Sequence, residues 1–169
     1  IRRYGLDDDS LNAIDSESKR MTRMVSDLLL LAQADAGQLP LKTENLELDT
    51  LILSVFEQAK VLASDGGPTL ELIRFEAVRV HADPDRLTQL FLNLISNAIK
   101  HTGSDGKVSL AVWPNGPEAM VRVTDTGEGI PPEDLPHIFD RFYRVDKARA
   151  RSMGGAGLGL AIAHWITEA

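Results

Sequence analysis

One stretch of the chain combines amides and cations in a pattern that suggests an anionic ligand. Residues 83–102 open with Asp83 and Pro84, a capping carboxylate followed by a proline that suits the first turn of a helix. At the helical period one side of this stretch is apolar, and the other side carries Arg86, Gln89, Asn93, Asn97, Lys100 and His101. No Asp or Glu stands between Arg86 and His101. The pattern indicates an anionic partner, with or without a metal; the alternative is a surface helix that happens to lack acids.

Two glycine-containing turns are further candidates for ligand contact. Residues 125–130, Asp-Thr-Gly-Glu-Gly-Ile, follow an expected strand. Their glycines permit close backbone approach, and their first carboxylate can accept a hydrogen bond from an amino group such as the exocyclic amine of adenine. Residues 154–160, Gly-Gly-Ala-Gly-Leu-Gly-Leu, precede an expected helix, whose free N–H groups favour phosphate. The second segment fits neither a P-loop nor a Rossmann fingerprint. Taken singly, each segment also fits a plain turn or a flexible joint.

Between the two turns, aromatic and basic side chains alternate. They are Phe139, Phe142 and Tyr143 with Arg141, Arg144, Lys147, Arg149 and Arg151. Aromatic rings can anchor a mobile lid while the basic groups neutralise phosphate charge. The alternative is an exposed basic loop with a small hydrophobic cluster of its own.

These candidate residues require an α+β fold to position them. The patterns predict helices over residues 11–36, 49–63, 83–102 and 157–169, and strands over residues 69–75, 78–82, 108–113 and 120–124. Residues 39–48 are interpreted as a linker with a short strand, and Asp49 is expected to cap the helix that follows. Because helices and strands do not alternate regularly, we expect a mixed sheet packed on helices. Residues 125–155 are expected to be irregular, and loops of that length are usually lids or binding loops.

The first predicted helix carries a narrow apolar seam. Its members, spaced alternately three and four apart, are Leu11, Ile14, Ser18, Met21, Val25, Leu28 and Ala32. A seam of this kind needs a partner helix, and we expect it on another chain or on a segment outside this one. The alternative is that the helix packs on the globular part.

Composition narrows the range of partners. A chain of 169 residues forms one ordinary domain, or a small domain with an appended element. The net charge of −7 argues against nucleic acid or an anionic membrane as the main partner. The absence of cysteine excludes disulfides and is compatible with the cytosol. The longest aliphatic run, residues 28–32, is far shorter than the roughly 20 residues that span a bilayer. We therefore expect a cytoplasmic chain without membrane contact of its own.

In their order along the chain, these motifs resemble those of a known family. The asparagine helix, Asp-Thr-Gly-Glu-Gly, Phe-Asp-Arg-Phe-Tyr-Arg and Gly-x-Gly-Leu-Gly-Leu look like the N, G1, F and G2 boxes of the sensor histidine kinases of two-component systems. The resemblance covers nearly the whole chain. It implies part of a dimerisation and phosphotransfer helix over residues 1–38, a linker over residues 39–48, and a catalytic ATP-binding domain of the GHKL superfamily over residues 49–169. The implied fold is a two-layer α/β sandwich of the Bergerat type.

The resemblance also implies a role for each matching residue. Asn97 would bind Mg²⁺ with Asn93 assisting, because a neutral ligand suits an ion that shares its charge with phosphates. Lys100 and His101 would approach the phosphates and Arg144 would hold them, so that Asn93, Lys100 and Arg144 are the implied catalytic residues. Asp125 would bind the adenine amine. The remaining implied contacts to ATP are Gly127, Gly129, Ile130, Phe142, Gly155, Ala156, Gly157, Leu158, Gly159 and Leu160.

Some positions depart from the family pattern. The four histidines all lack the acid and Leu-Arg-x-Pro that follow the family's acceptor histidine, so we expect the acceptor outside this chain. The family continues into further strands, and a C-terminally truncated domain is therefore expected. ATP-hydrolysing relatives such as gyrase have a glutamate four residues before the metal-binding asparagine. Here that residue is Asn93, which predicts slow hydrolysis. Ala156 replaces a common Ser or Thr.

The implied activity is that of the ATP-binding catalytic part of a sensor histidine kinase. It would use Mg²⁺ and ATP and donate the γ-phosphate to a histidine on a separate segment. The implied partners are a second copy, joined through the first helix to form a homodimer, and a response regulator. The parent protein would be a membrane-bound sensor. The alternative is a nucleotide-binding or dimerisation module that binds ATP without productive transfer.

Overall fold

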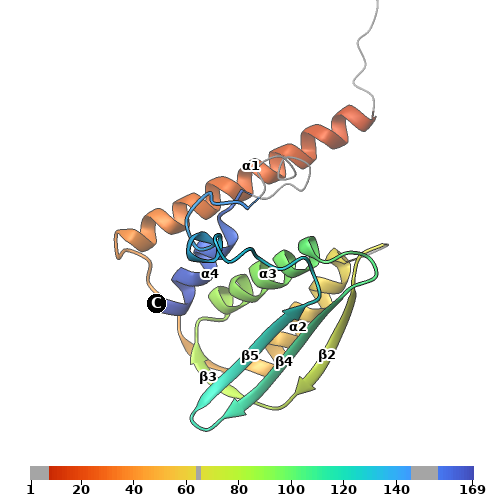
Figure 1. Cartoon of the computed structure of the whole chain (residues 1–169). Helices are drawn as coiled ribbons and strands as arrows, with labels where there is room; N and C mark the ends of the chain where they lie inside the picture. Colours follow the sequence, from red (N-terminus) through yellow and green to blue (C-terminus); the bar gives the residue numbers. More distant parts are fainter. Residues whose placement is uncertain (1–7, 64–65, 146–155) are drawn as a thin grey trace, which may run out of the picture.

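The computed structural model describes residues 8–63, 66–145 and 156–169 (Figure 1). The elements in chain order are α1 (Asp8–Asp35), β1 (Glu44–Glu47), α2 (Leu48–Leu62), β2 (Thr69–Phe75), β3 (Arg79–Ala82), α3 (Pro84–His101), β4 (Lys107–Asn115), β5 (Glu118–Asp125), a 3-10 turn (Leu135–His137) and α4 (Gly159–Glu168). Each predicted helix and strand is present, and the β4–β5 hairpin is longer than the pattern indicated because its strands extend into the turn. None of the described helices combines the length and the apolar character needed to cross a bilayer.

The sheet is mixed, as expected. In its three-stranded part β4 lies in the centre, parallel to β2 and antiparallel to β5. A parallel pair needs a crossover connection, and here β3 and α3 supply it between β2 and β4. β1 and β3 form a separate antiparallel pair.

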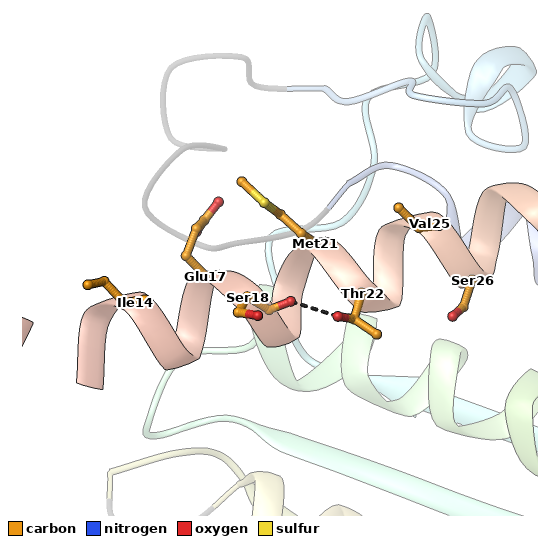
Figure 2. A pocket seen from close by; sticks show the side chains of 7 residues that line it. All are labelled: Ile14, Glu17, Ser18, Met21, Thr22, Val25 and Ser26. Carbon is orange, nitrogen blue, oxygen red and sulfur yellow. Dashed lines mark hydrogen bonds between the residues drawn. The ribbon is translucent and has the colours of Figure 1, made fainter. Parts of the chain in front are cut away.

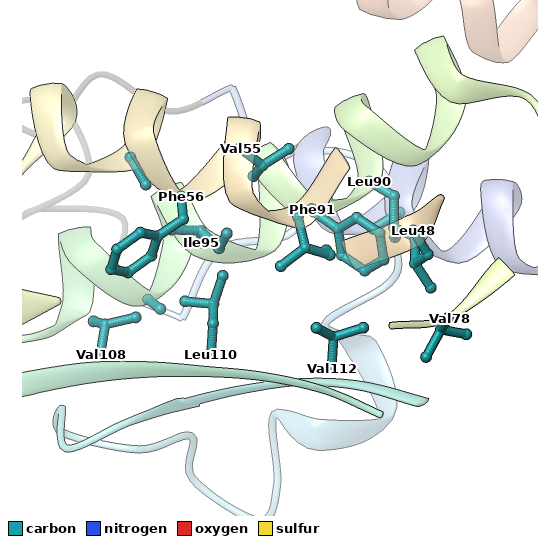
Figure 3. Close-up of a cluster of buried hydrophobic side chains, with 14 residues drawn as sticks. Leu48, Val55, Phe56, Val78, Leu90, Phe91, Ile95, Val108, Leu110 and Val112 are labelled. Carbon is teal, nitrogen blue, oxygen red and sulfur yellow. The ribbon is translucent and has the colours of Figure 1, made fainter. Parts of the chain in front are cut away.

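The hydrophobic core lies between this sheet and helices α2 and α3. Figure 3 shows Val108, Leu110 and Val112 of β4 pointing toward the two helices, and none of the three has exposed surface. Alternate residues of a strand share a face, so these three positions form one row. The helices contribute Ile52, Val55, Phe56, Leu90, Phe91 and Ile95. The expected two-layer α/β sandwich is therefore confirmed, and its core holds α3 by the face opposite its polar stripe.

Helix α1 lies outside this sandwich and packs on α4 (Figure 1). Leu30 and Leu31 are buried in a second cluster with Leu158 and Ile162. Arg141 also forms a two-pronged ion pair with Asp35, with nitrogen–oxygen distances of 2.6 and 2.8 Å. Helix α1 therefore does pack on the globular part, which was the alternative to pairing with a partner helix.

The predicted seam of α1 lies on another face. Leu11, Ile14, Met21 and Val25 are each about half exposed or more. Figure 2 shows the shallow groove between Ile14, Met21 and Val25 and the polar side chains beside them, all of them on α1. The seam is therefore still available to a partner helix.

Two sequence-based predictions about helix starts were wrong. Asp49 does not cap α2, because the backbone N–H of Leu48 already donates to the carbonyl of Val78 and the chain passes directly from β1 into the helix. The Asp49 carboxylate instead accepts a hydrogen bond from the N–H of Val78, at 3.2 Å. Helix α4 begins at Gly159, because Gly157 has a φ of +72° and cannot belong to a right-handed helix.

Candidate functional site

The buried carboxylate of Asp83 fixes the start of α3. One of its oxygens accepts hydrogen bonds from the N–H groups of Asp85 and Arg86, at 3.0 and 3.1 Å. The other accepts from the N–H of Lys42 in the linker, at 2.8 Å. Together with Pro84 in the first turn, this is the predicted cap. It sets the rotation of the helix and with it the direction of the polar stripe.

Asn93 and Asn97 lie one turn apart on α3 and are both half-buried. The Asn93 amide donates to the carbonyl of Gly159 at the start of α4, at 3.2 Å. The side chain of Asn97 makes no hydrogen bond with the described part of the chain, so its amide oxygen is available to a ligand. The asparagine motif and the end of the last glycine motif therefore lie in contact.

The loop after β5 packs against the C-terminal end of α3. The N–H of Gly127 donates to one carboxylate oxygen of Asp125 at 2.9 Å. A side chain on Gly127 would place its Cβ 2.2 Å from the carbonyl oxygen of His101. The His101 ring lies 3.1 Å from the carboxylate of Glu128. The loop that carries Asp125 therefore lies against the end of α3 that carries His101. Glu128, to which the sequence gave no role, helps to join the loop to the helix.

The aromatic–basic segment is joined to the last glycine motif through Phe142. This residue has the unusual φ of +64°, and its N–H donates to the carbonyl of Gly157 at 2.8 Å. A Cβ on Gly157 would lie 2.9 Å from the backbone of Phe142 and Tyr143, so only glycine allows this approach. The aromatic–basic segment and the last glycine motif are thus adjacent. The positive φ of Phe142 stores backbone strain, which this contact must offset.

Lys100 lies in a cluster of positive charges. Its pKa is below the usual value, first because partial enclosure penalises the charged ammonium, although the side chain keeps contact with solvent, and then because Arg23 and Arg144 lie nearby. Arg144 was predicted at this site; Arg23 of α1 was not. Cations held together in this way suit a phosphate ligand.

Some predicted contacts are placed differently. The side chain of Leu158 is buried against α1, and Ala156 packs on the same cluster, so both side chains belong to the contact with α1. Phe142 is more than half exposed, Ile130 is 40% exposed and Leu160 is half-buried. Gly129 has a φ of +71°, and a Cβ there would meet no heavy atom within 4 Å. Gly155 lies outside the described residues, as do Lys147, Arg149 and Arg151.

The amide oxygen of Asn97 suits a divalent ion that also contacts the oxygens of a phosphate ligand. Within residues 8–63, 66–145 and 156–169, no three His, Asp or Glu side chains gather as a metal site. An ion here would depend on the Asn97 amide oxygen and on oxygens of the ligand, an arrangement that Mg²⁺ accepts because it keeps part of its water shell.

Comparison with known protein families agrees with this geometry. The family described as histidine kinase-, DNA gyrase B-, and HSP90-like ATPase matches residues 82–169. The sensor protein kinase WalK of Staphylococcus saprophyticus is 40% identical over 161 residues, which cover 94% of this chain and 26% of that protein. The phosphate regulon sensor protein PhoR of Pseudomonas aeruginosa is 35% identical over 157 residues, or 93% of this chain and 35% of that protein.

Solved structures extend the similarity to the fold. Full-length ShkA in complex with AMPPNP matches 97% of this chain and 35% of its own, with a TM-score of 0.76 and 26% identity. The Acinetobacter baumannii histidine kinase AdeS matches 96% of this chain and 74% of its own, with a TM-score of 0.72 and 25% identity. The present chain spans about a quarter to a third of the length of the curated relatives.

Proposed function

The chain belongs to the family of histidine kinase-, DNA gyrase B- and HSP90-like ATPases, with a catalytic domain of the histidine kinase type, and from this premise we propose that it is a phosphate donor. It binds ATP with Mg²⁺ and presents the γ-phosphate to a histidine on a segment outside this chain. In a two-component system the phosphate then passes to a response regulator. The catalytic contribution of the protein is mainly positioning and charge neutralisation.

The observation that carries the proposal is that three segments distant in sequence meet along α3. The loop of Asp125 packs on the end of the helix, Gly159 is bonded to Asn93, and Arg144 lies near Lys100. The Asp125 oxygen that is not bonded to Gly127 can accept the adenine amine. Asn97, Lys100 and Arg144 then lie on the side where the phosphates would extend.

Asn97 is the residue that would hold Mg²⁺, with Asn93 nearby. When bound, the ion neutralises phosphate charge. The side chain of Asn93 is a neutral amide, which is not basic, so it cannot take a proton from water; its nitrogen donates to the carbonyl of Gly159. We therefore propose transfer to a histidine and not rapid hydrolysis.

The exposed seam of α1 supports a homodimer. Ile14, Met21 and Val25 recur at coiled-coil spacing and are largely uncovered, and an isolated apolar seam gains stability when it pairs. A second copy joined through this face would leave the α4-facing side of α1 undisturbed.

Titration of Mg²⁺·ATP into the wild type and Asn97→Ala tests the nucleotide site. We expect magnesium-dependent binding in the wild type. In the variant we expect at least tenfold weaker binding that no longer responds to magnesium. Asn115→Ala, in the exposed turn of the β4–β5 hairpin, is the matched control and should bind normally. Absence of magnesium-dependent binding in the wild type would refute the proposal.

Transfer itself is tested by adding a segment that carries an acceptor histidine. Labelled phosphate on that histidine, lost in Asn97→Ala, is the expected result. ATP binding without any labelled histidine would favour the alternative, a module that binds nucleotide and dimerises without transfer.

A further inference from the structure

The loop after β5 contacts the last residue of α3, His101, through both backbone and side chain. We propose that the His101–Glu128 pair holds this loop so that Asp125 points toward the adenine amine. Both are then positioning residues for the base and not ligands of the phosphates. This inference rests on the proposed function and deepens it, because it assigns the base preference of the site to two residues that act through Asp125.

Backbone contacts bring the loop to the end of α3. The N–H of Glu128 donates to the carbonyl of His101 at 3.4 Å, and the same carbonyl oxygen would lie only 2.2 Å from a Cβ on Gly127. The preceding residue, Thr126, is bonded to β4. Its N–H donates to the carbonyl of Lys107 at 3.0 Å, and its hydroxyl accepts from the Lys107 N–H at 2.9 Å. The loop is therefore held between β4 and α3 at successive residues.

The side chains of His101 and Glu128 add a further link. Nδ1 of the ring lies 3.1 Å from a carboxylate oxygen of Glu128, and because an ionised carboxylate can only accept, the ring nitrogen donates. Both side chains are about half exposed, and exposed pairs contribute little to the free energy of unfolding. The effect of the pair should therefore be local, on the position of the loop relative to α3.

The pair acts on Asp125 through Gly127. The N–H of Gly127 donates to one carboxylate oxygen of Asp125 at 2.9 Å, and this bond sets the direction of the other oxygen. Gly127 directly precedes Glu128, so a loop that moves away from His101 takes this N–H with it. The free oxygen of Asp125 then loses the fixed direction in which it can accept the adenine amine.

The charge of Glu128 argues against a direct phosphate contact by His101. A carboxylate 3.1 Å from the ring offsets the positive charge that the ring carries when protonated, and it would itself repel a phosphate. The two roles predict opposite effects of removing this carboxylate. If His101 binds phosphate, the loss of Glu128 strengthens ATP binding, and if the pair holds the loop, the same loss weakens it.

The test measures the affinity for Mg²⁺·ATP and for Mg²⁺·ITP, the inosine nucleotide, whose base carries an oxygen in place of the adenine amino group. We expect the wild type to prefer ATP, because Asp125 can accept a hydrogen bond from the amine and not from that oxygen. Glu128→Ala and His101→Ala should each bind ATP about two- to fivefold more weakly, as for the loss of an exposed pair, and should bind ITP as the wild type does. The double variant should lose no more than either single variant, since the two side chains act as one unit.

The controls remove matched groups from the β1–β3 pair, which leads into the other end of α3. His81 is exposed and its ring lies 3.0 Å from the amide oxygen of Asn45, and Glu47 is exposed and pairs with Arg79 at 2.8 Å. His81→Ala and Glu47→Ala should bind both nucleotides as the wild type does. Glu128→Gln removes the charge but keeps an acceptor for the ring N–H, so it should recover most of the ATP affinity lost in Glu128→Ala.

Several results would overturn the inference while leaving the proposed function intact. They are tighter ATP binding in Glu128→Ala, an equal loss for ATP and ITP in His101→Ala, and unchanged ATP affinity in both variants. A wild type that binds ATP and ITP equally would do the same, because Asp125 would then not distinguish the amine. A wild type that binds no Mg²⁺·ATP would refute the proposed function and this inference together.

Discussion

Gly127 is the position at which one methyl group would separate α3 from the loop that carries Asp125. Its added Cβ would lie 2.2 Å from the carbonyl oxygen of His101, which is backbone and cannot rotate away. We expect Gly127→Ala to lower the free energy of unfolding by about 1–3 kcal/mol, as overpacking does. The same displacement of Asp125 should weaken ATP binding.

The matched control is Gly103→Ala, in the turn after α3. A Cβ on Gly103 would meet no heavy atom within 4 Å, so stability and binding should remain those of the wild type. Chemical denaturation and ATP titration of both variants provide the comparison. Equal behaviour of the two variants would show that the Gly127 contact has no part in the site.

At the scale of single residues, the sequence predicted the side chains that belong to a repeating pattern. The polar stripe with Asn93 and Asn97 was visible because the helical period places it opposite the apolar residues. Glu128 was not identified, because its importance depends on His101, which lies far from it in sequence. Only the packing of the segments reveals such pairs.

Asp83 controls the start of α3, and its contribution should depend on pH. Burial alone would raise the pKa of its carboxyl group, but hydrogen bonds from the N–H groups of Lys42, Arg86 and Asp85, with the nearby Arg86 charge, hold this pKa below its ordinary value. A carboxyl group whose pKa is lower in the folded protein stabilises the fold above its unfolded pKa of about 3.9. This stabilisation is lost as the pH falls below about 4 and through the folded pKa.

Two substitutions separate the cap from the charge. Asp83→Ala removes both and should cost about 1–2 kcal/mol at pH 7. Asp83→Asn keeps a good capping group, so it should cost less and should lose less stability than the wild type between pH 5 and the acid limit. Denaturant midpoints measured across that range would decide. Parallel pH profiles for wild type and Asp83→Asn would contradict the assignment.

At the scale of elements, strands and helices followed from periodicity because each buries one face. β2 was predicted over residues 69–75 and spans the same residues in the structure. The two helix starts that were predicted wrongly depend on hydrogen bonds between residues far apart in sequence. Helix α2 starts early because the N–H of Leu48 donates to Val78, and α4 starts late because the carbonyl of Gly157 accepts from the N–H of Phe142. Neither partner can be identified from the local sequence.

For the whole molecule, the decisive feature is that α1 has two apolar faces with different roles. The seam of Ile14, Met21 and Val25 was predicted because its spacing is regular and long. The docking face is short, consisting mainly of Leu30 and Leu31, and the sequence gave no sign of its partner on α4. The position of α1 relative to the catalytic part was thus outside what periodicity could predict.

An exposed ion pair between Arg141 and Asp35 also links α1 to the segment after β5, and exchanging the charges tests whether it helps to position the helix. Asp35→Arg places two arginines face to face and should loosen α1, whereas adding Arg141→Asp restores an ion pair of reversed polarity. Since the chain has no cysteine, spin labels on Lys19→Cys and Asn115→Cys report the distance between α1 and the β4–β5 hairpin without interference. We expect a broad distance distribution for the single variant and a narrow one for wild type and the double variant.

The control for this exchange is Asp15→Arg, because Asp15 pairs with Lys19 within α1 and makes no link to Arg141. With the α1 label moved to Thr22→Cys, it should leave the distance narrow. Both charges of the Asp35 pair are partly exposed, so added salt should broaden the wild-type distribution as well. A narrow distribution for Asp35→Arg would mean that the hydrophobic contact of Leu31 alone positions the helix, and a double variant as broad as Asp35→Arg would mean that the charges of this pair do not position it.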